Sequence, residues 1–185
     1  IKRCDIANDM INEIIKIISE EYINYLKYFS DIMIRVIDSN IQIGLTVDAK
    51  YNADEVLERE KEKLEEVKNN ILKQKEVDSI IQIYLKDIKN NRFLAAVGDD
   101  IKIEFLGKKY YVHPNSFFQV NQKQAEKIYS DILKELKKQD TKNNVLIDMY
   151  SGVGVSTVLF SSMFEKVIAI ENNVEAVEMA DRNAI

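Results

Sequence analysis

The ten residues from Val145 to Gly154, Val-Leu-Ile-Asp-Met-Tyr-Ser-Gly-Val-Gly, constrain the fold of this chain more than any other stretch. An apolar run, Val145–Ile147, is followed by an acid, a Gly-x-Gly turn and a helix-like segment over Val155–Met163. This order predicts a buried parallel strand that leads through a glycine loop to the N-terminus of a helix. Backbone N–H groups at such a terminus can meet a cofactor.

The side chains around the glycines restrict the class of that cofactor. Thr157 stands where the dinucleotide fingerprint needs its third glycine, which disfavours nicotinamide and flavin. Asp148 would repel a pyrophosphate but attract the ammonium group of S-adenosylmethionine. Glu171 ends a second apolar run, Val167–Ile170, and an acid there can accept hydrogen bonds from a ribose diol. On these features alone, an ordinary βαβ unit whose glycines only tighten a turn remains the alternative.

Composition sets outer limits on the function. The 185 residues are 46% hydrophobic, enough for one or two domains with a real core. The net charge of −5 shows no overall basic character, although a local basic face could still bind nucleic acid. The single cysteine, Cys4, excludes an internal disulfide and fits a reducing compartment such as the cytoplasm.

No apolar run approaches the ~18 residues of a membrane span. No signal peptide is visible, and a chain that starts without Met leaves its targeting unread.

The first 114 residues predict an α+β domain. Apolar spacing predicts a helix over Asp5–Phe29, and alternation predicts a β-hairpin formed by Ile32–Ile37 and Ile41–Val47. A charged but amphipathic helix follows over Ala53–Gln74. Four short strands are then expected in an antiparallel meander: Ile80–Leu85, Arg92–Val97, Ile101–Leu106 and Lys108–Val112. We place the domain boundary near Pro114, the only proline of the chain.

The stretch after this proline reads Asn115-Ser116-Phe117-Phe118-Gln119-Val120-Asn121 and leads into a helix that we expect to reach about Lys138. Asn121 is the predicted N-cap of that helix. Two adjacent aromatic residues and a glutamine are unusual in a simple connector, although Phe117 and Phe118 could instead plug a domain interface. His113, the sole histidine, has no acid or nucleophile beside it in sequence and is taken as structural.

Two segments together resemble the RNA uracil-5-methyltransferase family, which makes 5-methyluridine in transfer and ribosomal RNA. Pro114–Asn121 looks like the family's P-x-S/D-F-x-Q-V-N motif, and Asp148–Gly154 with Glu171 looks like its D-x-[FY]-C-G-x-G loop and strand-end acid. The resemblance implies an α/β fold class. A central α+β domain over residues 1–114 would be followed by the first part of a Rossmann-like methyltransferase domain over residues 115–185.

This resemblance also implies roles for single residues. Gln119, Tyr150 and Glu171 would contact S-adenosylmethionine, Phe117 would wall the uracil or cofactor pocket, and an RNA, either rRNA or tRNA, would be the partner. The cofactor-binding set that we expect is Gln119, Asp148, Tyr150, Gly152, Gly154 and Glu171.

The chain departs from the family pattern at several positions. Ser151 stands where the family commonly has cysteine, and Val155 stands where it has a polar residue, so a side-chain contact there is in doubt. Cys4 matches a cysteine that completes an iron–sulfur cluster in some members. One thiolate cannot hold such a cluster, so we expect a lone buried thiol and no metal.

The residues of the reaction itself are expected elsewhere. Carbon 5 of uracil becomes nucleophilic only after a thiolate adds at carbon 6, and a base must later remove the carbon-5 proton. By the resemblance, that cysteine and a glutamate base would follow Ile185, so we expect no catalytic residue and no turnover from this chain alone. Two other readings stay open, a non-catalytic RNA-binding or assembly module with a methyltransferase-like core, and a methyltransferase for another substrate. The oligomeric state and the identity of the RNA are left open.

Overall fold

The computed structural model describes residues 5, 7, 9–75 and 79–185, and the chain divides into two compact units, Ile1–Ile101 and Lys102–Ile185. Cys4 lies outside the described residues, so its predicted burial stays a prediction. The division falls earlier than the boundary expected near Pro114, because the hairpin before that proline groups with the second unit. No helix in the described part of the chain is both long enough and apolar enough to cross a membrane.

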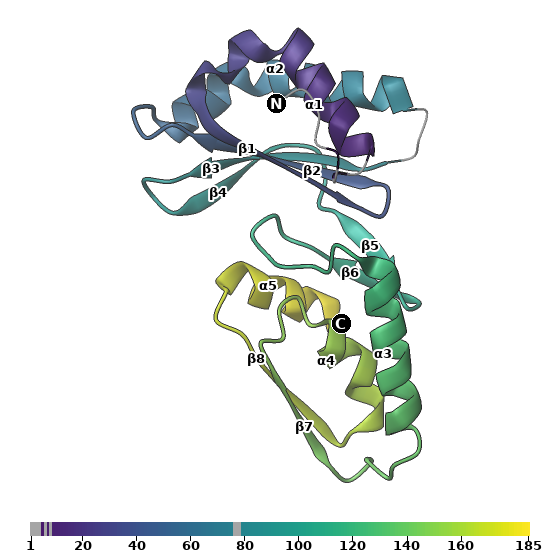
Figure 1. Ribbon diagram of the computed structural model, residues 1–185. Helices are drawn as coiled ribbons and strands as arrows, with labels where there is room; N and C mark the ends of the chain where they lie inside the picture. Colours follow the sequence, from purple (N-terminus) through teal and green to yellow (C-terminus); the bar gives the residue numbers. More distant parts are fainter. Residues whose placement is uncertain (1–4, 6, 8, 76–78) are drawn as a thin grey trace. The chain divides into compact units, whose positions relative to one another are not determined.

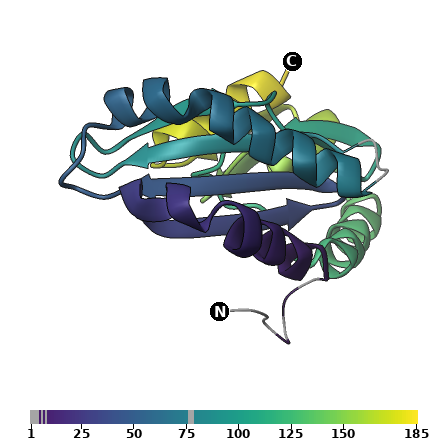
Figure 2. The ribbon, with the colours of Figure 1, turned by 90° about the horizontal axis from the view of Figure 1, so that it is seen from above.

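The first unit is a four-stranded sheet with two α-helices on one of its faces (Figure 1, Figure 2). The strand order in the sheet is β1-β2-β3-β4. In chain order the elements are α1 (Asp9–Glu21), the 3-10 helix η1 (Ile23–Tyr28), β1 (Phe29–Ile37), β2 (Asn40–Val47), α2 (Ala53–Lys75), β3 (Ile81–Asp87) and β4 (Arg92–Val97). The predicted β-hairpin and the predicted charged helix are therefore confirmed.

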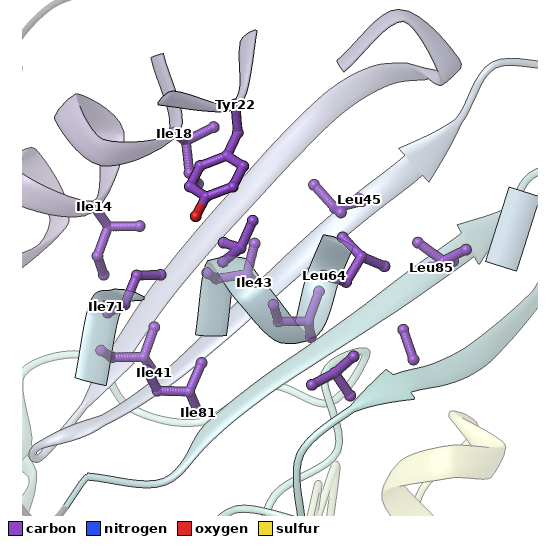
Figure 3. Close-up of a cluster of buried hydrophobic side chains, with 14 of the residues drawn as sticks. Ile14, Ile18, Tyr22, Ile41, Ile43, Leu45, Leu64, Ile71, Ile81 and Leu85 are labelled. Atoms are coloured by element: carbon purple, nitrogen blue, oxygen red, sulfur yellow. The ribbon is translucent and has the colours of Figure 1, made fainter. Parts of the chain in front are cut away.

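The core of this unit lies between the sheet and its two helices (Figure 3). Ile41, Ile43 and Leu45 alternate along β2 and are almost fully buried. They meet Ile14 of α1 and Ile71 of α2, both of which are 0% exposed. The apolar stripe of each helix is thus buried, and most of the Glu and Lys side chains described for α2 lie on its other face, although Glu60 is buried.

Two expectations for this unit were wrong. The four strands after α2 do not form one antiparallel meander. β3 pairs antiparallel with β4 but in parallel with β2, and the last two strands, over Lys102–Phe105 and Lys108–Tyr111, pair with each other in a separate sheet. A 23-residue helix between β2 and β3 is long enough to return the chain for parallel pairing. The long first helix stops at Glu21 and continues as η1. Tyr22, Tyr25 and Tyr28 recur every third residue, a spacing that puts them on one face of a 3-10 helix.

The second unit joins an antiparallel hairpin to a parallel βαβ segment. Its elements are β5 (Lys102–Phe105), β6 (Lys108–Tyr111), α3 (Gln122–Leu136), β7 (Val145–Met149), α4 (Val155–Phe160), the 3-10 helix η2 (Ser161–Met163), β8 (Lys166–Ile170) and α5 (Val174–Asn183). Asn121 caps α3 as predicted, because its side chain accepts a hydrogen bond from the backbone N–H of Gln124 at 3.2 Å. The predicted fold class is confirmed by these two units.

A buried asparagine joins three parts of the second unit. Asn183, at the end of α5, accepts from the N–H of Tyr111 at 2.7 Å and donates to the carbonyl of the same residue at 3.1 Å. Its amide also donates to the carbonyl of Val153 in the glycine loop at 2.9 Å. One side chain therefore fastens the β5–β6 hairpin and the glycine loop to α5, which explains why the hairpin belongs to this unit.

Replacing Asn183 by alanine is expected to lower the free energy of unfolding by about 2–3 kcal/mol, because it leaves buried backbone groups without partners. Urea denaturation followed by circular dichroism measures the loss. Ala184→Gly, at the adjacent exposed position, serves as the control. A change of less than about 0.5 kcal/mol in Asn183→Ala, the size usual for surface sites, would contradict the fastening role.

Candidate cofactor site

The glycine loop between β7 and α4 is shaped by three residues in the left-handed backbone region. The φ angles are 60° at Tyr150, 56° at Gly152 and 81° at Gly154. Ser151 donates its N–H to the carbonyl of Ile170 at 3.2 Å and accepts from the N–H of Gly154 at 2.9 Å. The loop therefore stays attached to the end of β8 while it turns into α4.

The two glycines serve different purposes. A Cβ atom at Gly154 would lie 3.2 Å from the Cβ of Ala180 on α5, tighter than ordinary contact. Gly154 thus permits close packing of the loop on α5. A Cβ atom at Gly152 would meet nothing within 4 Å. The backbone of Gly152 therefore borders open space that a ligand can approach.

Glu171, directly after β8, organises the loop with its carboxylate. One oxygen accepts the N–H of Gly152 at 2.9 Å, and the other accepts the N–H groups of Asn172 at 2.8 Å and Asn173 at 2.9 Å. The backbone N–H groups of Asn173 and Gly152 hold the pKa of Glu171 below its usual range, and that of Asn172 adds to the effect. The carboxylate thus links the glycine loop to the two residues that precede α5, the second of which is its N-cap.

Asp148, at the end of β7, faces hydroxyl groups of α4. Its Oδ2 accepts from the hydroxyl of Ser156 at 2.7 Å and from that of Thr157 at 2.5 Å. The N-cap of α4 is Gly154, which makes no side-chain cap, and the negative charge of Asp148 lies beside the first turn of this helix through its two hydroxyl contacts. Burial raises the pKa of Tyr129 on α3, the nearby Ser156 hydroxyl lowers it, and the charge of Asp148 raises it further.

A pocket of about 140 Å³ lies beside the loop, within the second unit. Three of the expected site residues other than glycine line it: Phe117, Gln119 and Tyr150. Phe117 is 69% exposed and Tyr150 is 87% exposed, so both aromatic rings stand at the rim. Gly152 and Ser156 contribute polar groups from the loop and from the start of α4. The pocket therefore joins the two sequence motifs in one concave site.

The aromatic floor of this pocket was not foreseen from the sequence. Phe105 packs edge-to-face on Phe118 with ring centroids 6.0 Å apart, and on Tyr129 at 5.7 Å. All three line the pocket. Tyr129 follows Ala125 by four residues on the buried side of α3, and that spacing was the signal available in the sequence. Phe118 is buried among aromatic side chains of its own unit.

The other expected residues surround the pocket without lining it. Asp148 contacts the pocket residue Ser156, and Glu171 contacts the pocket residue Gly152, each through a hydrogen bond. Gly154 lies on the side of the loop that packs against α5. The assignment of the six residues to cofactor binding stays a prediction. His113 caps its own loop, because its Nδ1 accepts from the N–H of Asn115 at 3.1 Å.

Comparisons with known proteins agree with a methyltransferase. The model of the RNA cap guanine-N2 methyltransferase family matches residues 143–185. A Clostridium tetani protein named as an uncharacterized RNA methyltransferase is 31% identical over 201 residues, which cover all of this chain and 42% of that protein. The tRNA (uracil(54)-C(5))-methyltransferase of Pyrococcus furiosus is 40% identical over 81 residues, which cover 44% of this chain and 18% of that enzyme.

A solved structure gives a weaker match. The tRNA (uracil-54, C5)-methyltransferase of Pyrococcus abyssi, in complex with S-adenosyl-L-homocysteine, aligns with a TM-score of 0.49 and 23% identity, over 79% of this chain and 32% of that one. The chain thus spans less than half the length of each of these relatives.

Proposed function

We propose that this chain, a relative of RNA methyltransferases that include enzymes for carbon 5 of uracil, holds S-adenosylmethionine for methyl transfer to that carbon in an rRNA or tRNA. The observation that carries this proposal is the pocket itself. It brings Gln119, Tyr150 and the open backbone of Gly152 together, although Gln119 lies 33 residues before Gly152 in the sequence.

The residues present fit this cofactor in charge and shape. Asp148 and Glu171 are both acids beside the loop, and neither forms an ion pair within the described residues. Two such carboxylates favour a ligand that carries positive charge, as the sulfonium and ammonium groups of S-adenosylmethionine do. The cofactor supplies the electrophilic methyl group when bound.

The chain's own residues would bind and orient the cofactor. Gln119 offers an amide at the rim, and Tyr150 and Phe117 offer exposed aromatic faces for a flat ring. Both oxygens of Glu171 already accept backbone N–H groups, so a ribose hydroxyl would share this carboxylate and Glu171 would act mainly by holding the loop. The other oxygen of Asp148 accepts no hydrogen bond from the described residues, so it would be available to the cofactor.

A second candidate reaction has its own support. The matching family model describes methylation of guanine N2 in an RNA cap, and its match covers the glycine loop, β8 and α5. In our proposal those elements bind the cofactor and not the base that is methylated, so they do not distinguish guanine from uracil. The Pro114–Asn121 block lies outside that match, and by its resemblance it favours uracil.

Gln119→Ala is expected to weaken binding of S-adenosylhomocysteine to this chain about tenfold, the equivalent of one lost hydrogen bond with part of its contact area. Isothermal titration measures the dissociation constant. Gln139→Ala, on the exposed turn after α3, is the matched control and should bind like the unchanged chain. Equal binding by the two variants would remove Gln119 from the site.

The reaction can be identified with RNA tritiated at carbon 5 of its uridines. Methyl transfer to that carbon replaces the tritium, which is released into water, whereas methylation of guanine releases none. The assay uses the protein as it is encoded in its gene. Nucleoside analysis of the same RNA provides a second readout. Methylguanosine without tritium release would overturn the uracil proposal in favour of the second candidate.

A further inference from the structure

A second pocket lies wholly within the first unit, at the start of α2. It has a volume of about 280 Å³, and we call it the tyrosine pocket after two of the residues that line it. It is defined by Tyr28, Lys50, Tyr51, Arg59 and Lys89. These residues come from four places in the chain, namely the end of η1, the loop after β2, helix α2 and the turn after β3. Neither sequence motif includes any of them.

Two tyrosine rings form the apolar wall of the pocket. Tyr28 and Tyr51 pack edge-to-face with centroids 5.0 Å apart and an interplanar angle of 74°. Tyr28 is buried, while Tyr51 is only partly covered. A partly covered ring that is held in place by a buried neighbour offers a rigid surface on which a nucleobase can stack.

Basic side chains surround these rings. The guanidinium of Arg59 lies 5.6 Å from the centre of the Tyr28 ring, and the ammonium of Lys50 lies 5.1 Å from that of Tyr51. Lys27 adds a further cation 4.9 Å from the Tyr28 ring. Arg59 also donates to the Tyr28 hydroxyl at 3.1 Å, which fixes the guanidinium against the pocket. The Arg59 and Lys27 bonds lower the pKa of Tyr28, as a cationic setting should.

The local charge favours an anion even though the whole chain is acidic. Three cations and one carboxylate, Glu55, line the pocket, so the lining carries a net charge of about +2, against −5 for the chain. Asp48 pairs with Lys50 at 3.0 Å, and Glu60 adjoins Arg59. The Lys50 side chain is 60% exposed in that pair. Exposed ion pairs contribute little to stability, so Lys50 can exchange Asp48 for a phosphate.

We propose that the tyrosine pocket binds one nucleotide of a single-stranded RNA segment. Arg59, Lys50 and Lys89 would hold its phosphate, and its base would lie against Tyr51. An arginine with several donors and flanking lysines suits phosphate, and an aromatic face suits any base. The inference rests on the proposed function in one respect, that the substrate is RNA. It adds a contact within the first unit, made by none of the residues of the cofactor site.

The test is the binding of a fluorescein-labelled uridine oligonucleotide to the chain, followed by fluorescence anisotropy. The double variant Lys50→Gln/Lys89→Gln is expected to bind about tenfold more weakly at low salt, with a salt dependence of log K shallower by about one to two units. The double variant Lys134→Gln/Lys138→Gln is the matched control, because these exposed lysines of the α3 region remove the same charge. Equal losses in both double variants would overturn the inference.

The variant Tyr51→Ala distinguishes the contribution of base stacking to oligonucleotide binding from the contribution of charge. It should weaken oligonucleotide binding about fivefold or more without changing the salt slope, since it removes a ring and no charge. Unchanged affinity would overturn the nucleotide proposal and leave only an anion site. Competition makes the same distinction, because uridine monophosphate should displace the oligonucleotide at lower concentration than inorganic phosphate or an oligo-aspartate peptide. Equal displacement by these competitors would also count against RNA.

The two proposals fail in different ways. Binding of S-adenosylhomocysteine is measured on the same tyrosine-pocket variants and should stay unchanged. An unmodified chain that binds S-adenosylhomocysteine but not the oligonucleotide would overturn this inference alone. A chain that binds the oligonucleotide through the tyrosine pocket but not S-adenosylhomocysteine would support the inference and count against the proposed cofactor site.

Discussion

Gly154→Ala is expected to lower the free energy of unfolding by about 2–5 kcal/mol, because the new methyl group carries both a backbone cost and a packing cost. About 1–2 kcal/mol comes from forcing an L-residue into the left-handed region at φ 81°. A further 1–3 kcal/mol comes from the added Cβ, which would lie 3.2 Å from Ala180 and push α5 away from the loop. Urea denaturation monitored by circular dichroism measures the loss.

Gly152→Ala is the matched control for this experiment. Its φ of 56° imposes a similar backbone cost, but its Cβ would meet nothing within 4 Å, so the packing cost is absent. We therefore expect Gly152→Ala to lose only about 1–2 kcal/mol of stability. Because Gly152 borders the pocket, the same variant should bind S-adenosylhomocysteine more weakly. Equal stability losses in the two variants would show that the contact with α5 is not tight.

Glu171→Gln is expected to weaken binding of S-adenosylhomocysteine by about ten- to a hundredfold. An amide keeps one acceptor oxygen, but its nitrogen cannot accept, so either Gly152 or the Asn172–Asn173 pair loses its partner. The effect on stability should be smaller, about 1–2 kcal/mol, because the carboxylate is partly exposed to water. Glu178→Gln, on the exposed side of α5, removes the same charge and serves as the control.

The pH dependence of stability tests the same carboxylate. Folding lowers the pKa of Glu171, so its contribution is present above the unfolded-state pKa of about 4.3. The contribution is then lost as the pH falls through the lower folded-state pKa. Denaturation midpoints measured between about pH 6 and pH 3 should therefore fall less steeply in Glu171→Gln than in Glu178→Gln. Parallel curves would contradict the loop-organising role of Glu171.

Local patterns predicted most of the fold, because short-range chemistry decides those elements. The alternation in Ile41–Val47 predicted a strand, the apolar stripe of Ala53–Gln74 predicted a helix, and Asn121 was correctly placed as an N-cap. The pairing of strands was harder to predict. Parallel pairing of β2 with β3 depends on how α2 packs across the sheet, which no local pattern encodes.

The sequence located the residues of the candidate pocket that lie within the two motifs and missed those that join it only through packing; the role of all of them in cofactor binding stays a prediction. Phe117, Gln119, Tyr150 and Gly152 line one pocket, as the two motifs together implied. Phe105 of β5 and Tyr129 of α3 complete the pocket, and no sequence pattern predicts that their rings are in contact. Asp148 was expected to face a ligand, and the structure shows one of its oxygens engaged by two α4 hydroxyls. The resemblance to the RNA uracil-5-methyltransferase family, drawn from these motifs, agrees with the curated relatives.

The backbone of Tyr150 bears on any attempt to engineer this protein. A tyrosine at φ 60° is strained by about 1–2 kcal/mol, yet its side chain is 87% exposed and contributes little packing in return. A stability-driven redesign would therefore select glycine or asparagine at this position and report an improvement. Such a variant would discard an aromatic face at the rim of the pocket, so thermal stability alone is a misleading criterion for selecting improved forms of this loop.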